Sequence, residues 1–283
     1  MSVGTYGTKS GAIPFRSMFT TQKVVLGPYA EPMHLIEAKL QANYGTETTL
    51  QDPTINGKIA AARESVERDT MRAMLWQKRS ITMDEWPDRI DIYCCPVRSD
   101  MPVAITYYDT AGAQQTLATS VYKVRYDLEP ATITLKSQQQ WPTLYDESGV
   151  ITVTFTSGYA VPFTVNTTSN VLTFTGFTPV NDTTFMLSNS GGSLPTGLAK
   201  NTLYYVVSAS GSTCKLATSS GGSAIDITSV GSGLHFLGVV PPTAMEAMRL
   251  KFAVSFIARE GDAPVTCEDS YYSMLKSMKY TFL

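Results

Sequence analysis

The side chains most able to do chemistry in this sequence are its two histidines, His34 and His235. Histidine is the usual general base of hydrolases, where it takes a proton from an activated serine and is oriented by an acid. His235 stands in the apolar run Leu234–Leu237, and the sequence has no G-x-S-x-G segment that would expose such a serine. We therefore predict that His235 is a strand residue with ordinary partners and that the protein is not an enzyme.

The densest group of carboxylates surrounds Trp86 and comprises Asp84, Glu85, Asp88 and Asp91. Carboxylate oxygens are the ligands that hard cations such as Ca²⁺ prefer. The group lacks the D-x-D-x-D-G spacing that wraps one loop around an ion. We predict a solvated turn here and no bound metal.

The four cysteines are Cys94, Cys95, Cys214 and Cys267. Adjacent residues of a strand point to opposite faces, so Cys94 and Cys95 fit neither a C-x-x-C zinc site nor a disulfide framework. We expect reduced, partly buried thiols.

The two Gly-Gly pairs, Gly191-Gly192 and Gly221-Gly222, lie in turns of a β-rich stretch and not between a strand and a helix. This position argues against a phosphate-binding loop. No cofactor is predicted.

Length and charge limit the remaining classes. The 283 residues suffice for about two domains, and a net charge of −2 gives no general attraction to nucleic acid or anionic membranes. The first residues lack the basic and apolar regions of a signal peptide, and no apolar run is long enough to span a bilayer. We predict a soluble protein that is made in the cytoplasm.

The chain changes character after Tyr159 and changes back before Pro241. Residues 163–238 contain only four charged residues, which are Asp182, Lys200, Lys215 and Asp226. Inserting a module into a surface loop leaves a core intact when the loop ends lie close together. We predict an N-terminal arm at 1–29, a core domain formed by 30–162 and 239–283, and an inserted β domain at 163–238.

The core domain has helical and strand-like segments, which predict an α+β fold. Helices are expected at about Pro32–Tyr44, at Asp52–Trp76 with Asp52 as N-cap, after Pro241–Pro242, and at about Glu268–Met278. They should form a helical bundle. Between Ser80 and Thr156 the apolar period becomes two, which predicts a small antiparallel β-sheet and hairpin region.

The insert has a strand pattern throughout and no helix pattern, which is typical of a β-sandwich or small barrel. Its few charges leave strand edges unprotected, so we expect the outer strands to be covered within the fold or by another protein. The predicted strands are Val171–Thr175, Thr183–Ser188, Thr202–Ser208, Thr213–Ala217, Ala224–Thr228 and Leu234–Leu237.

The order of motifs in the core domain resembles the head-tail connector (adaptor, or head completion) proteins of tailed bacteriophages. The segments that carry this resemblance are Ala60–Glu67, Leu75–Gln77, Ile81–Pro87, Ile90–Tyr93, Pro96–Val97, Ile105–Asp109, Tyr122–Val124, Trp141–Pro142, Val153–Tyr159, Pro241–Pro242 and Ala258–Glu260. The insert resembles β modules of other phage structural proteins at Leu198–Val207. The insert itself and the C-terminal segment depart from the usual family pattern.

The resemblance implies a virion protein of the neck, at the portal vertex, that is made in the host cytoplasm. Copies would form a ring, with a dodecamer expected, that binds the portal protein and tail or nozzle proteins. Packaged DNA would pass through its channel without sequence-specific binding. Lys279, Tyr280, Phe282 and Leu283 are the candidates for portal docking, and the insert would project outward, where it could contact the capsid.

A different virion role is the alternative. A tail-completion or baseplate protein could use the β insert to bind host-surface glycans. A carbohydrate site needs exposed aromatic rings near polar groups, and Tyr204, Tyr205 and Phe185 are the candidates. Neither reading involves a membrane.

Overall fold

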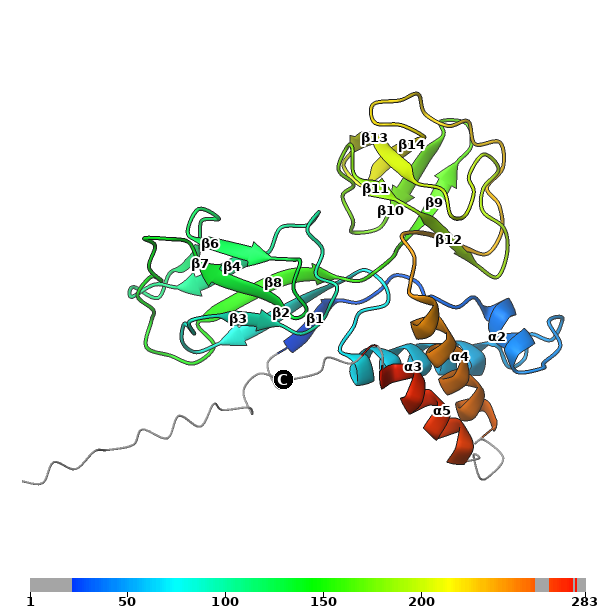
Figure 1. Ribbon diagram of the computed structural model, residues 1–283, viewed down its shortest axis with the longest axis horizontal. Coiled ribbons are helices and arrows are strands. Elements are labelled where there is room, and N and C mark those ends of the chain that lie inside the picture. Colours follow the sequence, from blue (N-terminus) through cyan, green and yellow to red (C-terminus); the bar gives the residue numbers. More distant parts are fainter. Residues whose placement is uncertain (1–21, 258–264, 277, 279–283) are drawn as a thin grey trace, which may run out of the picture.

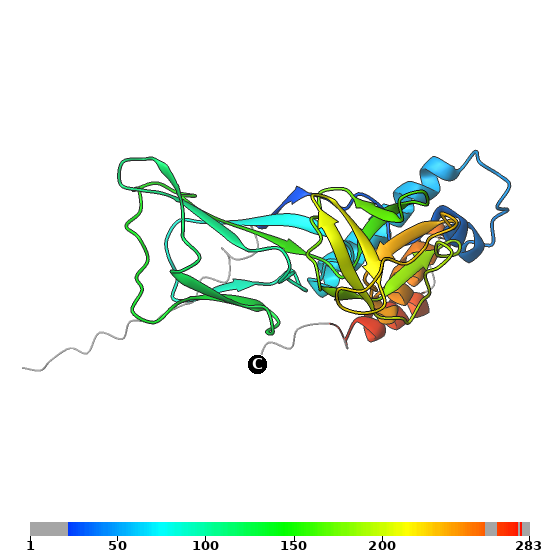
Figure 2. The ribbon, with the colours of Figure 1, turned by 90° about the horizontal axis from the view of Figure 1, so that it is seen from above.

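The computed structural model describes residues 22–257, 265–276 and 278 and has an α+β fold with three lobes (Figure 1). The sandwich lobe contains β1 to β8, the barrel lobe contains β9 to β15, and the helical lobe contains the helices. Seen from above, the sandwich lobe extends to one side, while the barrel lobe overlaps the helical lobe (Figure 2). The described helices are α2 (Leu35–Gln41), α3 (Asp52–Thr70), α4 (Pro242–Ile257) and α5 (Val265–Lys276).

Helix α3 is the long amphipathic helix of the sequence, but both of its ends differ from the prediction. Gln51 and not Asp52 is the N-cap residue, and Asp52 forms an ion pair with Lys39 at 2.6 Å. The helix ends at Thr70 because Met71 adopts a left-handed conformation with φ of 55°. From Ala73 onward the backbone hydrogen bonds are long-range, as when the N–H of Trp76 donates to a carbonyl that follows β8.

The helices before and after the barrel lobe pack in one core. Ile59 and Val66 of α3, Phe252 of α4 and Leu275 of α5 belong to the same cluster of buried side chains. Figure 1 shows α4 and α5 crossing α3. The chain segments on either side of the barrel lobe therefore fold together. None of the described helices combines the length and apolar character that crossing a membrane requires.

The sandwich lobe consists of two antiparallel sheets that share an apolar core. One sheet has the order β1-β2-β8-β4-β5 and the other has the order β3-β7-β6. This β region is larger than the small sheet and hairpin expected from the sequence. The strands are β1 (Gln22–Leu26), β2 (Gln77–Met83), β3 (Ile90–Ile92), β4 (Ala104–Tyr108), β5 (Gln114–Thr116), β6 (Tyr122–Arg125), β7 (Ala131–Leu135) and β8 (Ile151–Ser157).

Strand β1 changes the boundary expected for the N-terminal arm. Residues 22–29 were predicted to belong to the arm, yet Gln22–Leu26 pairs with β2 at the edge of the five-stranded sheet. Polar residues and Gly27 hide the strand period in this segment, so the pairing partner decides its conformation. The rest of the arm, residues 1–21, lies outside the described residues.

The barrel lobe is one seven-stranded antiparallel sheet of order β11-β13-β14-β10-β9-β15-β12. Its outermost strands, β11 and β12, are separated in the chain by Met186 alone, so the two edges of the sheet must lie next to each other. The sheet is therefore nearly closed like a barrel, which protects edges that have few charges. The strands are β9 (Val161–Asn166), β10 (Val171–Phe174), β11 (Thr184–Phe185), β12 (Leu187–Ser190), β13 (Tyr204–Ser210), β14 (Thr213–Ala217) and β15 (Leu234–Leu237).

The chain enters and leaves the barrel lobe at one place, because Val161 at the start of β9 pairs with Leu237 at the end of β15. The predicted strands at Thr213–Ala217 and Leu234–Leu237 have the observed bounds. The prediction of a strand at Ala224–Thr228 is wrong. This segment is irregular, and the amide of Ile227 donates to the side chain of Asn170 instead of to a neighbouring strand.

Candidate functional site

A buried charge network joins the helical lobe to the sandwich lobe. The Nε of Arg63 in α3 lies 2.8 Å from Oε2 of Glu31, and its Nη1 lies 2.9 Å from Oε2 of Glu67. The other oxygen of Glu67 accepts the backbone N–H of Met74 at 2.7 Å and the side-chain amide of Gln77 at 3.0 Å. The network fixes α3 against the start of β2 and against the segment before α2.

Burial raises the pKa of Glu31 above its ordinary value, although the hydrogen bond and charge of Arg63 act in the opposite direction. The carboxylate of Glu31 therefore depends on its cationic partner. Because Arg63 is buried and Glu31 is partly buried, this ion pair favours one arrangement of the elements, and removing one partner leaves an uncompensated charge.

A second set of polar contacts joins the barrel lobe to the helical lobe. The Oγ of Ser190 in β12 accepts the backbone N–H of His34 at 2.8 Å and donates to Oε2 of Glu37 in α2 at 2.5 Å. The Nε of Arg249 in α4 donates to Oε1 of Glu37 at 2.8 Å. Gly191 follows directly, and a Cβ atom at this position would lie 2.4 Å from the side chain of His34. Only glycine permits this approach.

Arg72 joins three parts of the chain just after α3. Its guanidinium lies 2.7 Å from the hydroxyl of Tyr159, which precedes the barrel lobe, and 3.0 Å from a carboxylate oxygen of Glu129 in the sandwich lobe. Its Nε donates to the carbonyl of Met278 at 3.0 Å, and Met278 is buried in the helical core. The predicted docking residues Lys279, Tyr280, Phe282 and Leu283 lie outside the described residues.

Aromatic side chains extend each core into its neighbour. Trp76, which precedes β2, is buried in the core of the barrel lobe and stacks on Tyr29 with 6.0 Å between the ring centroids. Phe236 of β15 is buried in the core of the helical lobe. The guanidinium of Arg98 lies 5.1 Å from the centroid of Phe177. The three lobes are therefore held as one unit by shared side chains.

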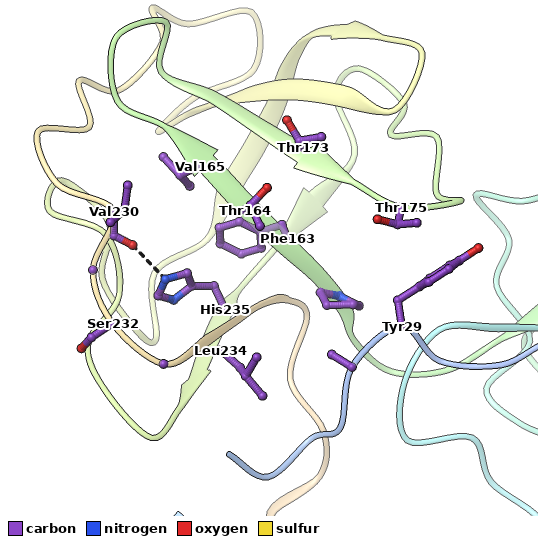
Figure 3. A pocket seen from close by; sticks show the side chains of 14 residues that line it. Tyr29, Phe163, Thr164, Val165, Thr173, Thr175, Val230, Ser232, Leu234 and His235 are labelled. Atoms are coloured by element: carbon purple, nitrogen blue, oxygen red, sulfur yellow. Dashed lines mark hydrogen bonds between the residues drawn. The ribbon is translucent and has the colours of Figure 1, made fainter. Parts of the chain in front are cut away.

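The two histidines lie in different contexts and both have structural roles. His34 caps α2, since its Nδ1 accepts the N–H of Ile36 at 3.2 Å. His235 lies on β15 at a surface hollow of about 630 Å³, shown in Figure 3 with Phe163 and Tyr29. Its Nε2 lies 2.9 Å from the carbonyl of Val230, so this nitrogen carries the hydrogen.

The other ring nitrogen of His235 makes the protonation of this residue unfavourable. Because Nε2 donates, Nδ1 accepts from the side-chain amide of Asn189, 2.9 Å away. Burial lowers the pKa of His235 below its ordinary value of 6.5, against the smaller opposing effect of the Val230 carbonyl. The imidazole is neutral in the folded protein near pH 7.

We expect the folded protein to lose stability as His235 is protonated. The unfolded chain binds the proton at the higher pKa, so the contribution is complete above pH 6.5 and is lost as the pH falls through the lower folded pKa. Urea unfolding at pH 5 and pH 7 should show a smaller pH dependence in His235→Gln than in the unchanged protein. Equal dependence in both proteins would contradict this assignment.

Asp84 and Asp91, two of the carboxylates around Trp86, each bind a different partner. An oxygen of Asp84 accepts the N–H of Gly149 at 2.6 Å, and Asp91 pairs with Arg89 at 2.8 Å. Trp86 stacks on Trp141 with 4.5 Å between centroids. Within residues 22–257, 265–276 and 278, no group of three or more His, Cys, Asp or Glu side chains is arranged to hold a metal ion.

The described cysteines belong to the apolar cores of the sandwich and barrel lobes. Cys94, Cys95 and Cys214 are buried, and burial raises the pKa of Cys94 to about 11 and that of Cys214 to about 12. Thiols of this kind are protonated at neutral pH and are poor nucleophiles. They pack as small apolar side chains.

The aromatic residues proposed for glycan binding do not form one exposed platform. Tyr204 is buried, and its hydroxyl accepts the N–H of Ala199 at 2.8 Å. Phe185 is partly buried against the guanidinium of Arg98. Tyr205, the third candidate, is the next residue of β13 and is partly exposed. Since consecutive strand residues face opposite sides, Tyr204 and Tyr205 cannot present their rings together.

Sequence reasoning missed the residues that join the lobes. Glu31 and Arg63 are 32 positions apart, and Arg72 and Met278 are 206 positions apart. No periodicity or motif links positions at such separations. Two features of the sequence hint at these contacts, namely Arg63 on the inner face of α3 and Gly191. Neither feature identifies the residue that it will contact.

These observations define a class of α+β protein in which a helical lobe, a β-sandwich and a nearly closed β-barrel are rigidly joined. Two solved structures have this fold. One, described as the neck of an empty GTA particle computed with C6 symmetry, has a TM-score of 0.54 and 12% identity. The other, described as the virion of a native gene transfer agent (GTA) particle, has a TM-score of 0.51 and 12% identity.

Both likenesses extend over nearly the whole molecule, with 93% of this chain and 96% of the other chain covered in each case. These two proteins therefore have residues that align with the barrel lobe. At this identity the likeness is one of fold. Protein-family models give no match to the sequence, and no curated protein matches it either.

Proposed function

We propose that this protein is a structural component of the neck of a tailed phage or phage-like particle. Copies form a ring beneath the portal, connect the head to the tail and continue the DNA channel. The observation that carries this proposal is the likeness, over 93% of the chain, to a protein from the neck of a GTA particle. The connector motifs found in the sequence point to the same place in a virion.

The physical character of the subunit supports this proposal. A ring subunit must keep its shape while identical neighbours pack against it, and here each lobe is joined to the next by buried charges and shared aromatic rings. Assembly of a ring makes and breaks no covalent bonds, so a neck component needs no active site. DNA would pass through the ring without being read.

The neck assignment is tested by removing the protein from the particle. We expect particles made without it to contain portal but to lack the ring below it, and to fail to attach tails. Supplying the protein in trans should restore the ring, as seen by electron microscopy of the portal vertex. Complete necks in its absence would refute the proposal.

The C-terminal residues 279–283 are proposed to dock on the portal. We expect a chain truncated after Met278 to bind portal rings at least tenfold more weakly, because three apolar anchors, Tyr280, Phe282 and Leu283, are lost. Its unfolding midpoint should stay the same, since Met278 and its contact to Arg72 remain. A Lys279→Gln variant is the matched control and should bind nearly as well as the full chain. Undiminished affinity of the truncated chain would contradict the docking role.

The alternative is a tail-completion or baseplate protein whose barrel lobe binds host-surface glycans. The positions of Tyr204 and Phe185 weigh against it, since neither presents a free ring to solvent. Binding of the isolated protein to host cells, without the portal, would favour this alternative over the neck.

A further inference from the structure

The five-stranded sheet of the sandwich lobe has two open edges. Within the described residues, β1 pairs only with β2, and β5 pairs only with β4. The barrel lobe differs, because its outer strands are brought together by the short connection at Met186. An unpaired strand edge presents backbone N–H and C=O groups that readily pair with another chain unless the edge is protected.

Strand β1 has the side chains of a pairing strand. Val24 and Val25 are 44% and 51% exposed, although branched side chains of this kind usually pack against neighbours in a sheet. The strand contains no proline. Gln22 and Val24 line a surface hollow together with Arg63, Glu64 and Arg68 of α3, and the register against β2 shifts between Val24 and Leu26. Its one charged residue is Lys23.

The two edges carry opposite charge. Beside β1, the exposed Lys23 and Lys78 are accompanied by Arg79, whose guanidinium bonds to the side-chain carbonyl of Gln77 at 3.1 Å. Lys78 pairs with the last residue of β1 in the sheet register. This edge is basic.

Beside β5, acidic residues outnumber the basic Lys136, whose Nζ donates to the carbonyl of Thr119 at 2.8 Å. Asp109 lies in the turn between β4 and β5 and accepts a hydrogen bond from Gln115 at 2.7 Å. The N–H of Tyr145 donates to the carbonyl of Tyr108 at 3.0 Å, which brings the exposed Asp146 and Glu147 next to the same hairpin. Like edges would repel each other, whereas β1 of one copy and β5 of another attract.

We propose that β1 of one copy lies against β5 of the next copy, so that the sheet continues from subunit to subunit. This inference rests on the proposed ring. A contact between two different edges of one chain is heterologous, which is the kind of contact that generates rings. Because every neighbouring pair in the sheet is antiparallel, β1 and β5 point the same way, and the new contact is parallel.

The register of the sheet sets the geometry of this contact. Following the pairs across the sheet, Gln115 of β5 is level with Met83 of β2, whereas Val24 of β1 is level with Arg79. The two edges are displaced along the strands by about four residues, or about 13 Å. A ring accommodates such a displacement when the strands are tilted to its axis, as they are in closed barrels.

The contact is tested by disulfide capture between copies of the full chain. The variant carries Val25→Cys and Gln115→Cys, and a control carries Val25→Cys with Lys200→Cys, which is exposed on the barrel lobe. We expect concentrated protein in low salt to give a ladder of linked chains after oxidation, at least tenfold more abundant than in the control. The ladder should disappear on reduction.

A charge exchange provides a second measurement. Lys23→Glu with Lys78→Glu should suppress the ladder at least fivefold, and adding Asp146→Lys with Glu147→Lys to the same chain should restore it. A ladder no stronger than that of the control would overturn the inference, as would linkage through Val25→Cys alone. If particles need the protein to form necks but the cysteine variant gives no ladder, the β1–β5 contact is wrong and the neck function stands. If the ladder forms but particles assemble complete necks without the protein, the neck function is wrong and the contact stands.

Discussion

Replacing Glu67 by alanine is expected to lower the free energy of unfolding by about 3 kcal/mol, because the buried guanidinium of Arg63 then lacks part of its compensating charge. The N–H of Met74 and the amide of Gln77 also lose their acceptor. Thermal unfolding followed by circular dichroism should shift down by roughly 6–12 °C.

The matched control for this change is Glu64→Ala on the same helix. Glu64 also contacts Arg63, at 3.5 Å, but its side chain is 68% exposed. A surface ion pair contributes less than about 1 kcal/mol, so this variant should unfold close to the unchanged protein. Equal losses in the two variants would mean that the buried network contributes nothing beyond an ordinary surface pair.

Replacing Gly158 by alanine should destabilise the fold by about 3 kcal/mol or prevent folding. Gly158 follows β8 with φ of +128°, a conformation that side chains rarely adopt. A Cβ atom there would lie 2.3 Å from the carbonyl oxygen of Leu75 and 2.6 Å from the backbone N of Trp76. Both obstacles are backbone atoms, so relief would require moving the start of β2 away from the end of β8.

Gly211→Ala provides the comparison for this substitution. Gly211 also has a positive φ, of +55°, but nothing lies within 4 Å of the added carbon. Only the left-handed backbone conformation is then unfavourable, at about 1 kcal/mol. Soluble yield and urea midpoints should rank the unchanged protein first, Gly211→Ala second and Gly158→Ala last. Any other order would show that the close approach at Leu75 relaxes easily.

Local signals in the sequence predicted the elements well where one segment decides its own conformation. Helix α4 begins at Pro242, next to the predicted start, and the strands at Thr213–Ala217 and Leu234–Leu237 have their predicted bounds. The α+β class follows from these segments. The turn spacing of residues 163–238 predicted a β-sandwich or small barrel. It did not predict that a single residue, Met186, would connect the two outermost strands, β11 and β12.

Elements whose ends depend on distant partners were predicted less well. The apolar period of α3 continues to Trp76, but the helix ends at Thr70. Beyond it, Ala73 donates its N–H to the carbonyl of Cys95, and residues 74–76 take partners near the barrel lobe. Strand β1 needs β2 to be recognised as a strand. The contacts of Arg63, Glu37 and Arg72 arise only when the three lobes are assembled.

The side-by-side position of β9 and β15 has a mechanical consequence. Both connections of the barrel lobe leave from one point, so a pull on this lobe loads them together instead of peeling the chain from one end. Trp76 and Phe236 would be drawn out of neighbouring cores by the same displacement. Tension on the barrel lobe would thus spread at once to the other two lobes of the chain.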